Sequence, residues 1–153
     1  MKKLQTNPPD NWDRSGLPAW TYFNEELFEL EAEELFRSHW QLVCHVNDFP
    51  HQGSFITFDL LGERALIIRD GESKISAFHN VCKHRGSRVV EKPAGNCSNA
   101  IICPFHGWSY NLNGTLRRVA KSGSLPYLDP HKWGLKPIEM DLWLGFIFLT
   151  GRF

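Results

Sequence analysis

Two short segments of the chain each combine a cysteine with a histidine. They read Cys82-x-His84 and Cys103-x-x-His106, and the 18 residues 85–102 separate them. Each segment follows an apolar run that we expect to form a strand, so both would be loops at the tips of neighbouring hairpins. Thiolate and imidazole groups are both ligands for transition metals. The spacing therefore predicts that four ligands converge on one metal centre.

Two kinds of metal centre use this ligand set. A two-iron, two-sulfide centre of mixed ligation takes two Cys on one iron and two His on the other, and this pattern lets each loop contribute to both irons. A structural zinc site also takes two Cys and two His, but zinc modules usually pair like ligands. The pattern favours iron and sulfide over zinc, with four plain core residues as the third interpretation. Gly86 and Gly107 follow the pairs, where a missing side chain would let backbone amides approach the centre.

The composition excludes several other classes of protein. A chain of 153 residues, 42% hydrophobic and 22% charged, is one globular domain or one domain with an extension. Lys plus Arg and Asp plus Glu number 17 each, which predicts neither nucleic-acid nor membrane binding. The longest apolar run, Leu142 to Leu149, is too short to cross a bilayer, and Gln5 to Asp13 is too polar for a signal peptide. We therefore expect a cytoplasmic protein, in which four Cys indicate metal or redox chemistry before disulfides.

One helix is predicted near the N-terminus. Residues 1–19 carry prolines without periodicity and are predicted to form an extended arm. Asn24 is a suitable N-cap, and Glu25 and Glu26 follow it in the first turn, where the helix dipole favours anions. Apolar residues then recur at helical spacing from Leu27 onward, so the helix is expected to end near Trp40.

The rest of the chain predicts short strands joined by turns. Asp70-Gly71 and Asn113-Gly114 are hairpin signals. The expected strands are residues 54–60, 64–69, 74–78, 100–103, 108–112, 115–119 and 143–150. The predicted fold is mainly β, with small antiparallel sheets and hairpins and an N-terminal helical extension. We expect the arm and helix in residues 1–41 and the β domain in residues 42–150.

The residues around the two Cys/His pairs resemble the cluster loops of a known family. Residues 80–86 read Asn-Val-Cys-Lys-His-Arg-Gly, and residues 103–110 read Cys-Pro-Phe-His-Gly-Trp-Ser-Tyr. Both resemble loops of the Rieske non-haem iron oxygenases, which include the large (alpha) subunits of aromatic-ring-hydroxylating dioxygenases and relatives acting on quaternary amines. Residues 18–20 and 39–43 resemble the segment that precedes the Rieske domain in these subunits. The resemblance covers residues 15–150 and implies a Rieske 2Fe–2S cluster.

The resemblance also implies roles for individual residues. The ligands would be Cys82, His84, Cys103 and His106, with support from Gly86, Gly107, Trp108 and Tyr110. Rieske subunits of the cytochrome bc type carry a disulfide between their loops and a serine hydroxyl beside the cluster. Ser87, Phe105 and Trp108 stand at those positions here, so the disulfide and one hydroxyl donor are missing. Fewer donors to the sulfur atoms would give a low reduction potential.

The function implied is electron transfer within a larger mono- or dioxygenase, such as those of aromatic hydrocarbon catabolism. A reductase or ferredoxin would supply electrons, and a mononuclear iron in a C-terminal domain, of the same or a neighbouring subunit, would use them to activate O₂. Full-length subunits of this kind are expected to form trimers. No second set of His ligands is apparent among the seven His, so this chain alone is expected only to transfer electrons. A stand-alone Rieske ferredoxin is the alternative, but the helix and the long segment after residue 120 favour the oxygenase.

The remaining candidate residues receive structural interpretations. Cys44 is expected to be a buried small hydrophobe, Cys97 a loop thiol, and His79 a strand residue. His39 and His45 are expected at the surface or as caps. Arg85 and Arg88 would either brace the first loop through acidic partners or belong to a docking surface for the electron donor.

Overall fold

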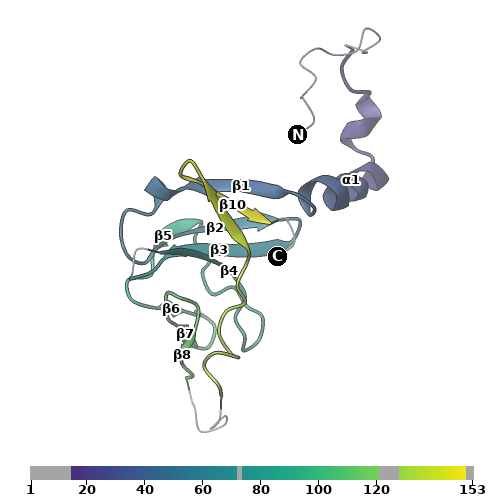
Figure 1. Ribbon diagram of the computed structural model, residues 1–153. Helices are drawn as coiled ribbons and strands as arrows, with labels where there is room; N and C mark the ends of the chain where they lie inside the picture. Colours follow the sequence, from purple (N-terminus) through teal and green to yellow (C-terminus); the bar gives the residue numbers. More distant parts are fainter. Residues whose placement is uncertain (1–14, 72–73, 121–127, 151–153) are drawn as a thin grey trace.

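The computed structural model describes residues 15–71, 74–120 and 128–150, and Figure 1 shows how their helices and strands are arranged. The part of the predicted arm in residues 1–14 lies outside this range. Ten strands form three antiparallel sheets, and the helical segment projects away from them at one end. The predicted fold class, mainly β with an N-terminal helical extension, is therefore confirmed.

The helical segment is shorter than the sequence predicts. A 3₁₀ turn, η1 (Ala19–Tyr22), precedes α1 (Glu25–Glu31), and a wider turn (Ala32–Phe36) completes the segment. The Asn24 side chain accepts a hydrogen bond from the N–H of Leu27 at 2.7 Å, which confirms the predicted cap. The segment ends at Phe36 instead of near Trp40, because the chain from Trp40 pairs with a strand. None of the described helices combines the length and apolar character needed to cross a membrane.

The first sheet pairs the strand that follows the helical segment with the last two strands of the described chain. Its strand order is β1-β10-β9, formed by β1 (Trp40–His45), β10 (Phe146–Thr150) and β9 (Met140–Trp143). The sequence predicts one strand over residues 143–150, but the chain turns back at Leu144 and Gly145, which both adopt positive φ. A tight hairpin of this type requires positive φ at both central residues. Leucine rarely adopts positive φ, and an apolar leucine is not a turn signal. The sequence therefore did not predict this turn.

The second sheet forms the centre of the molecule. Its order is β4-β3-β2-β5, formed by β2 (Ser54–Leu60), β3 (Glu63–Arg69), β4 (Ile75–His79) and β5 (Ala94–Asn96). Four consecutive residues of β3, Ala65 to Ile68, are fully buried, as expected for a strand covered on both faces. Ala65 and Ile67 pack toward the first sheet, whereas Leu66 and Ile68 pack toward the third. One rigid sheet thus separates two hydrophobic cores.

The third sheet carries the second Cys/His segment. It comprises β6 (Ile101–Ile102), β7 (Ser109–Tyr110) and β8 (Leu116–Arg118), and the turn predicted at Asn113-Gly114 joins the last two strands. Figure 1 shows these strands at the end of the molecule away from α1. Trp108 and Tyr110 are buried in the core on the Leu66 side of β3, together with both predicted cysteine ligands.

Asn80 anchors the segment that carries the first Cys/His pair. Its side chain is fully buried, accepts hydrogen bonds from the N–H groups of Val89 and Val90 at 3.1 and 3.0 Å, and donates to the carbonyl of Val90 at 2.7 Å. These bonds close residues 81–88 into a loop. They also satisfy backbone groups that the core would otherwise leave unpaired.

Replacing Asn80 with Ala should lower the free energy of unfolding by about 3 kcal/mol, at about 1 kcal/mol for each of three hydrogen bonds. Urea denaturation of the cluster-loaded protein under anaerobic conditions measures this change. Asn99 is exposed, so Asn99→Ala is the matched control and should change stability by less than about 0.5 kcal/mol. Equal stability of the two variants would contradict the anchoring role of Asn80.

Candidate metal centre

The two Cys/His segments form loops of the same backbone design, and we call them the first arm (residues 82–87) and the second arm (residues 103–108). In the first arm, the Cys82 N–H donates to the carbonyl of Ser87 at 2.7 Å, and the Gly86 N–H donates to the carbonyl of Cys82 at 2.9 Å. The second arm repeats this pattern from Cys103, at 2.8 and 3.0 Å. Both cysteines therefore occupy the same position in equivalent turns.

The glycines close these loops through their conformation. Gly86 and Gly107 have φ of 71° and 70°, in the left-handed region that residues with a side chain rarely adopt. A Cβ atom on Gly86 would meet no protein atom within 4 Å, so crowding by neighbouring residues does not explain the glycine there. Gly86 is therefore needed for the turn, and the expected approach of its backbone to the centre stays a prediction.

The four predicted ligands fall into two pairs. Cys82 and Cys103 are 2% and 1% exposed, and their side chains lie within hydrogen-bonding reach of each other. The rings of His84 and His106 lie 4.6 Å apart, and His106 is exposed. No three His, Cys, Asp or Glu side chains in the described ranges form a group suited to one metal ion. A mixed-ligand 2Fe–2S centre needs two thiolates on one iron and two imidazoles on the other. The two buried thiols and the two imidazoles nearer the surface match these two ligand pairs.

His84 has a buried nitrogen that suits a metal. Its Nδ1 atom is buried and has no hydrogen-bond partner among the described residues. Trp108, itself 2% exposed, stacks on the His84 ring at 5.0 Å with an interplanar angle of 8°, which holds the imidazole in place. A buried polar atom without a partner costs free energy, and coordination to a metal would remove that cost. The residues present therefore fit a metal centre.

A hydroxyl group contacts each thiol, and it comes from the other arm or from the strand that follows the other arm. The Tyr110 hydroxyl, on β7, lies 3.3 Å from Cys82 Sγ and accepts from the N–H of Lys83 at 3.1 Å, which leaves its own proton for the sulfur. The Ser87 hydroxyl, in the first arm, lies 3.3 Å from Cys103 Sγ. The sequence places Ser87 only where related proteins carry a disulfide cysteine, and its hydroxyl contact with Cys103 was not predicted.

The two thiols differ in acidity. Burial raises the pKa of Cys82, despite a hydrogen bond from Tyr110. Burial also acts to raise the pKa of Cys103, but hydrogen bonds from the Ser87 hydroxyl, the Phe105 backbone, the Cys82 thiol and the His106 backbone outweigh it and lower the pKa below its usual value. Cys103 is thus the thiol that more readily becomes a thiolate, the form that binds metals.

The other Cys and His candidates lie outside this centre. Cys44, on β1, is partly buried, and burial and then Asp48 raise its pKa to about 12. Burial also raises the pKa of Cys97, which packs against the core beneath the arms. His79 ends β4 opposite Ala65, and His45 accepts a hydrogen bond from the Asn47 N–H as a cap. Cys97, His79 and His45 agree with the structural roles that the sequence predicts, whereas Cys44 is less buried than expected.

Arg88 braces the end of the first arm. Its guanidinium forms two hydrogen bonds with the carboxylate of Asp59 on β2, at 3.2 and 2.5 Å. This is the bracing role that the sequence offered as one of two alternatives. Arg85 is exposed.

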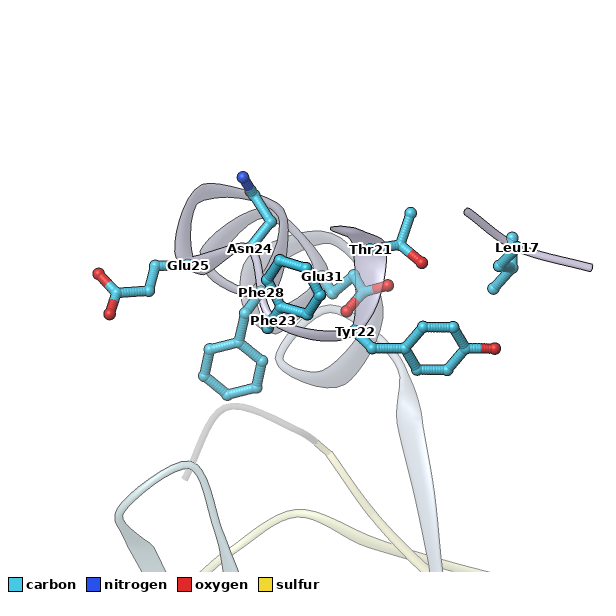
Figure 2. Close-up of a pocket in the computed structure, with 8 residues that line it drawn as sticks. All are labelled: Leu17, Thr21, Tyr22, Phe23, Asn24, Glu25, Phe28 and Glu31. Carbon is cyan, nitrogen blue, oxygen red and sulfur yellow. The ribbon is translucent and has the colours of Figure 1, made fainter. Parts of the chain in front are cut away.

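A surface pocket lies far from the arms in the sequence and is lined by residues between Leu17 and Glu31 (Figure 2). Figure 2 shows that its lining includes the aromatic rings of Tyr22, Phe23 and Phe28. None of its lining residues belongs to either arm. The pocket therefore takes no part in the metal centre.

The family model of the Rieske [2Fe-2S] domain matches residues 39–129, which include both arms. This chain belongs to that family. Membership implies a 2Fe–2S cluster, and both arms lie within the matched residues.

Known relatives narrow the branch of the family. The glycine betaine monooxygenase oxygenase subunit of Pseudomonas aeruginosa is 34% identical over 88% of this chain. A quaternary ammonium Rieske monooxygenase, described for carnitine oxidation and inter-subunit electron transfer, superposes with a TM-score of 0.76 at 30% identity over 86% of the chain. Naphthalene 1,2-dioxygenase with bound indole gives a TM-score of 0.75 at 31% identity over 85% of the chain. The resemblance to oxygenase large subunits is confirmed.

The chain spans only part of these relatives. It covers 31% of the betaine monooxygenase subunit, 36% of the quaternary ammonium monooxygenase and 30% of naphthalene dioxygenase. The homologous part is thus the Rieske domain of these proteins together with the segment before it.

Replacing Gly86 with Ala should lower the free energy of unfolding by about 1 kcal/mol, because a side chain disfavours positive φ. The absence of any atom near the added Cβ isolates the backbone effect from a steric clash. Gly86→Asn should cost less, since Asn tolerates the left-handed region. Urea unfolding of the three proteins measures this order, and an Ala variant as stable as the parent would contradict the requirement for glycine.

Proposed function

We propose that this chain is the electron-transfer Rieske domain of an oxygenase large subunit. It accepts electrons from a reductase or ferredoxin and passes them to a mononuclear non-haem iron in a further domain, where O₂ is activated for substrate oxidation. The pairing of two buried thiols with two imidazoles nearer the surface carries this proposal. Similarity to oxygenase subunits over 88% of the chain, well beyond residues 39–129, supports this branch over a stand-alone ferredoxin.

The proposed ligands are Cys82 and Cys103 on one iron and His84 and His106 on the other. When bound, the 2Fe–2S cluster supplies one-electron redox chemistry. Burial keeps the charge of the two thiolates away from water. The hydroxyl groups of Tyr110 and Ser87 stabilise this charge by hydrogen bonds. Because His106 is exposed, a protein docked at this end contacts imidazole and not sulfur.

One relative supports a larger assembly. Inter-subunit electron transfer is described for the quaternary ammonium monooxygenase, which shares this fold. By analogy, we infer that the cluster serves the catalytic iron of the same or a neighbouring subunit, within a homo-trimer of full-length chains. We assign residues 1–41 to the N-terminal arm and helix and residues 42–150 to the Rieske domain. We infer a cytoplasmic location from the composition.

Replacing Cys103 with Ser should abolish the visible absorption of the protein and lower its iron and sulfide content to background, because a thiolate ligand is lost. Cys97→Ser is the matched control, since Cys97 packs against the same core but lies outside both arms. It should retain the full cluster. Iron and sulfide analysis of anaerobically purified protein decides, and a Cys103→Ser variant with a complete cluster would show that the ligand assignment is wrong.

The 153-residue chain should accept one electron from a reductase with NADH but oxidise no substrate, because a Rieske cluster has no open coordination position for O₂. The assay combines the purified chain with a reductase, NADH, O₂ and a panel of aromatic and quaternary-amine compounds. Cluster reduction without product is expected. Hydroxylated or demethylated product that disappears in Cys82→Ser would contradict the proposal.

A further inference from the structure

Ser87 connects the two arms through its backbone and its side chain. Its carbonyl accepts the Cys82 N–H at 2.7 Å and closes the first arm, while its hydroxyl lies 3.3 Å from Cys103 Sγ in the second. The next residue, Arg88, is held by Asp59. The backbone at Ser87 is thus held by contacts that do not depend on the sulfur.

The direction of the Ser87–Cys103 hydrogen bond follows from the proposed function, on which this inference rests. A metal-bound cysteine is a thiolate, which has no proton to give. The serine hydroxyl must therefore be the donor. Ser87 is half-buried and Cys103 is 1% exposed, so little water competes for the sulfur, and hydrogen bonds to charged acceptors are stronger than neutral ones.

We propose that Ser87 sets the reduction potential of the centre by donating this hydrogen bond to Cys103. Reduction adds one electron and makes the cluster and its thiolates more negative. A donor at the sulfur stabilises this more negative state more than the oxidised state, so it raises the potential. Ser87 acts through Cys103 and is a positioning residue that shifts an equilibrium.

Removing the hydroxyl is the first test. Ser87→Ala should change the one-electron equilibrium constant about tenfold, which lowers the midpoint potential by ~59 mV. The iron and sulfide content and the oxidised absorption spectrum should remain those of the parent. Ser76→Ala is the control, because Ser76 is another half-buried serine but lies on β4, outside both arms. Its potential should equal that of the parent.

A second pair of variants removes any ambiguity from packing. Thr and Val have nearly the same shape and differ in one hydroxyl, so the difference in potential between Ser87→Thr and Ser87→Val reports the hydrogen bond even if Ala disturbs the arm. Ser87→Thr should have the higher potential. Spectroelectrochemical titration of all four variants measures these values.

The outcomes separate this inference from the proposed function. Equal potentials for Ser87→Thr and Ser87→Val, with full clusters in both, would overturn the role of Ser87 and leave the ligand assignment intact. A complete cluster in Cys103→Ser would instead overturn the ligand assignment, and the role of Ser87 with it. A higher potential in Thr than in Val, together with cluster loss in Cys103→Ser, would support both.

Discussion

The contact between two buried thiols from separate arms is the constraint on which the rest of the structure depends. Cys82 and Cys103 are almost completely excluded from water, and each must adopt the charged thiolate form to bind a metal. Burial alone would oppose that charge. The hydroxyl groups of Tyr110 and Ser87, and the backbone N–H groups of the arms, offset part of this cost. The two hydroxyl contacts also connect each arm with the other arm or its strand.

The sheets provide the rigid support for this contact. Because β3 is buried on both faces, it fixes one core beneath the arms and another behind the first sheet. Asn80 closes the loop that carries the first arm by bonding to residues beyond it, and Trp108 links the second arm to the His84 ring. The exposed His106 is then the side of the centre that a partner protein can reach. Electron entry at imidazole and charge retention at sulfur follow from this one arrangement.

Local signals in the sequence predicted much of this structure, but contacts between distant residues did not follow from them. The Asn24 cap, the Asn113-Gly114 turn and the strand at residues 54–60 depend on neighbouring residues, and the structure confirms them. The Leu144-Gly145 turn was missed because tertiary pairing, against the preference of leucine, imposes positive φ. The Ser87–Cys103 contact joins residues on different arms, so only the folded chain reveals it.

Nitrogen coupling to the reduced cluster tests the central claim most directly. The protein is labelled with ¹⁵N-histidine, reduced by one electron under anaerobic conditions and studied by pulsed EPR. The account predicts a 2Fe–2S signal coupled to the ¹⁵N nuclei of two histidines, with these couplings replaced by ¹⁴N couplings when unlabelled histidine is supplied. A cluster signal without histidine coupling, or a protein that binds zinc and gives no iron signal, would contradict it.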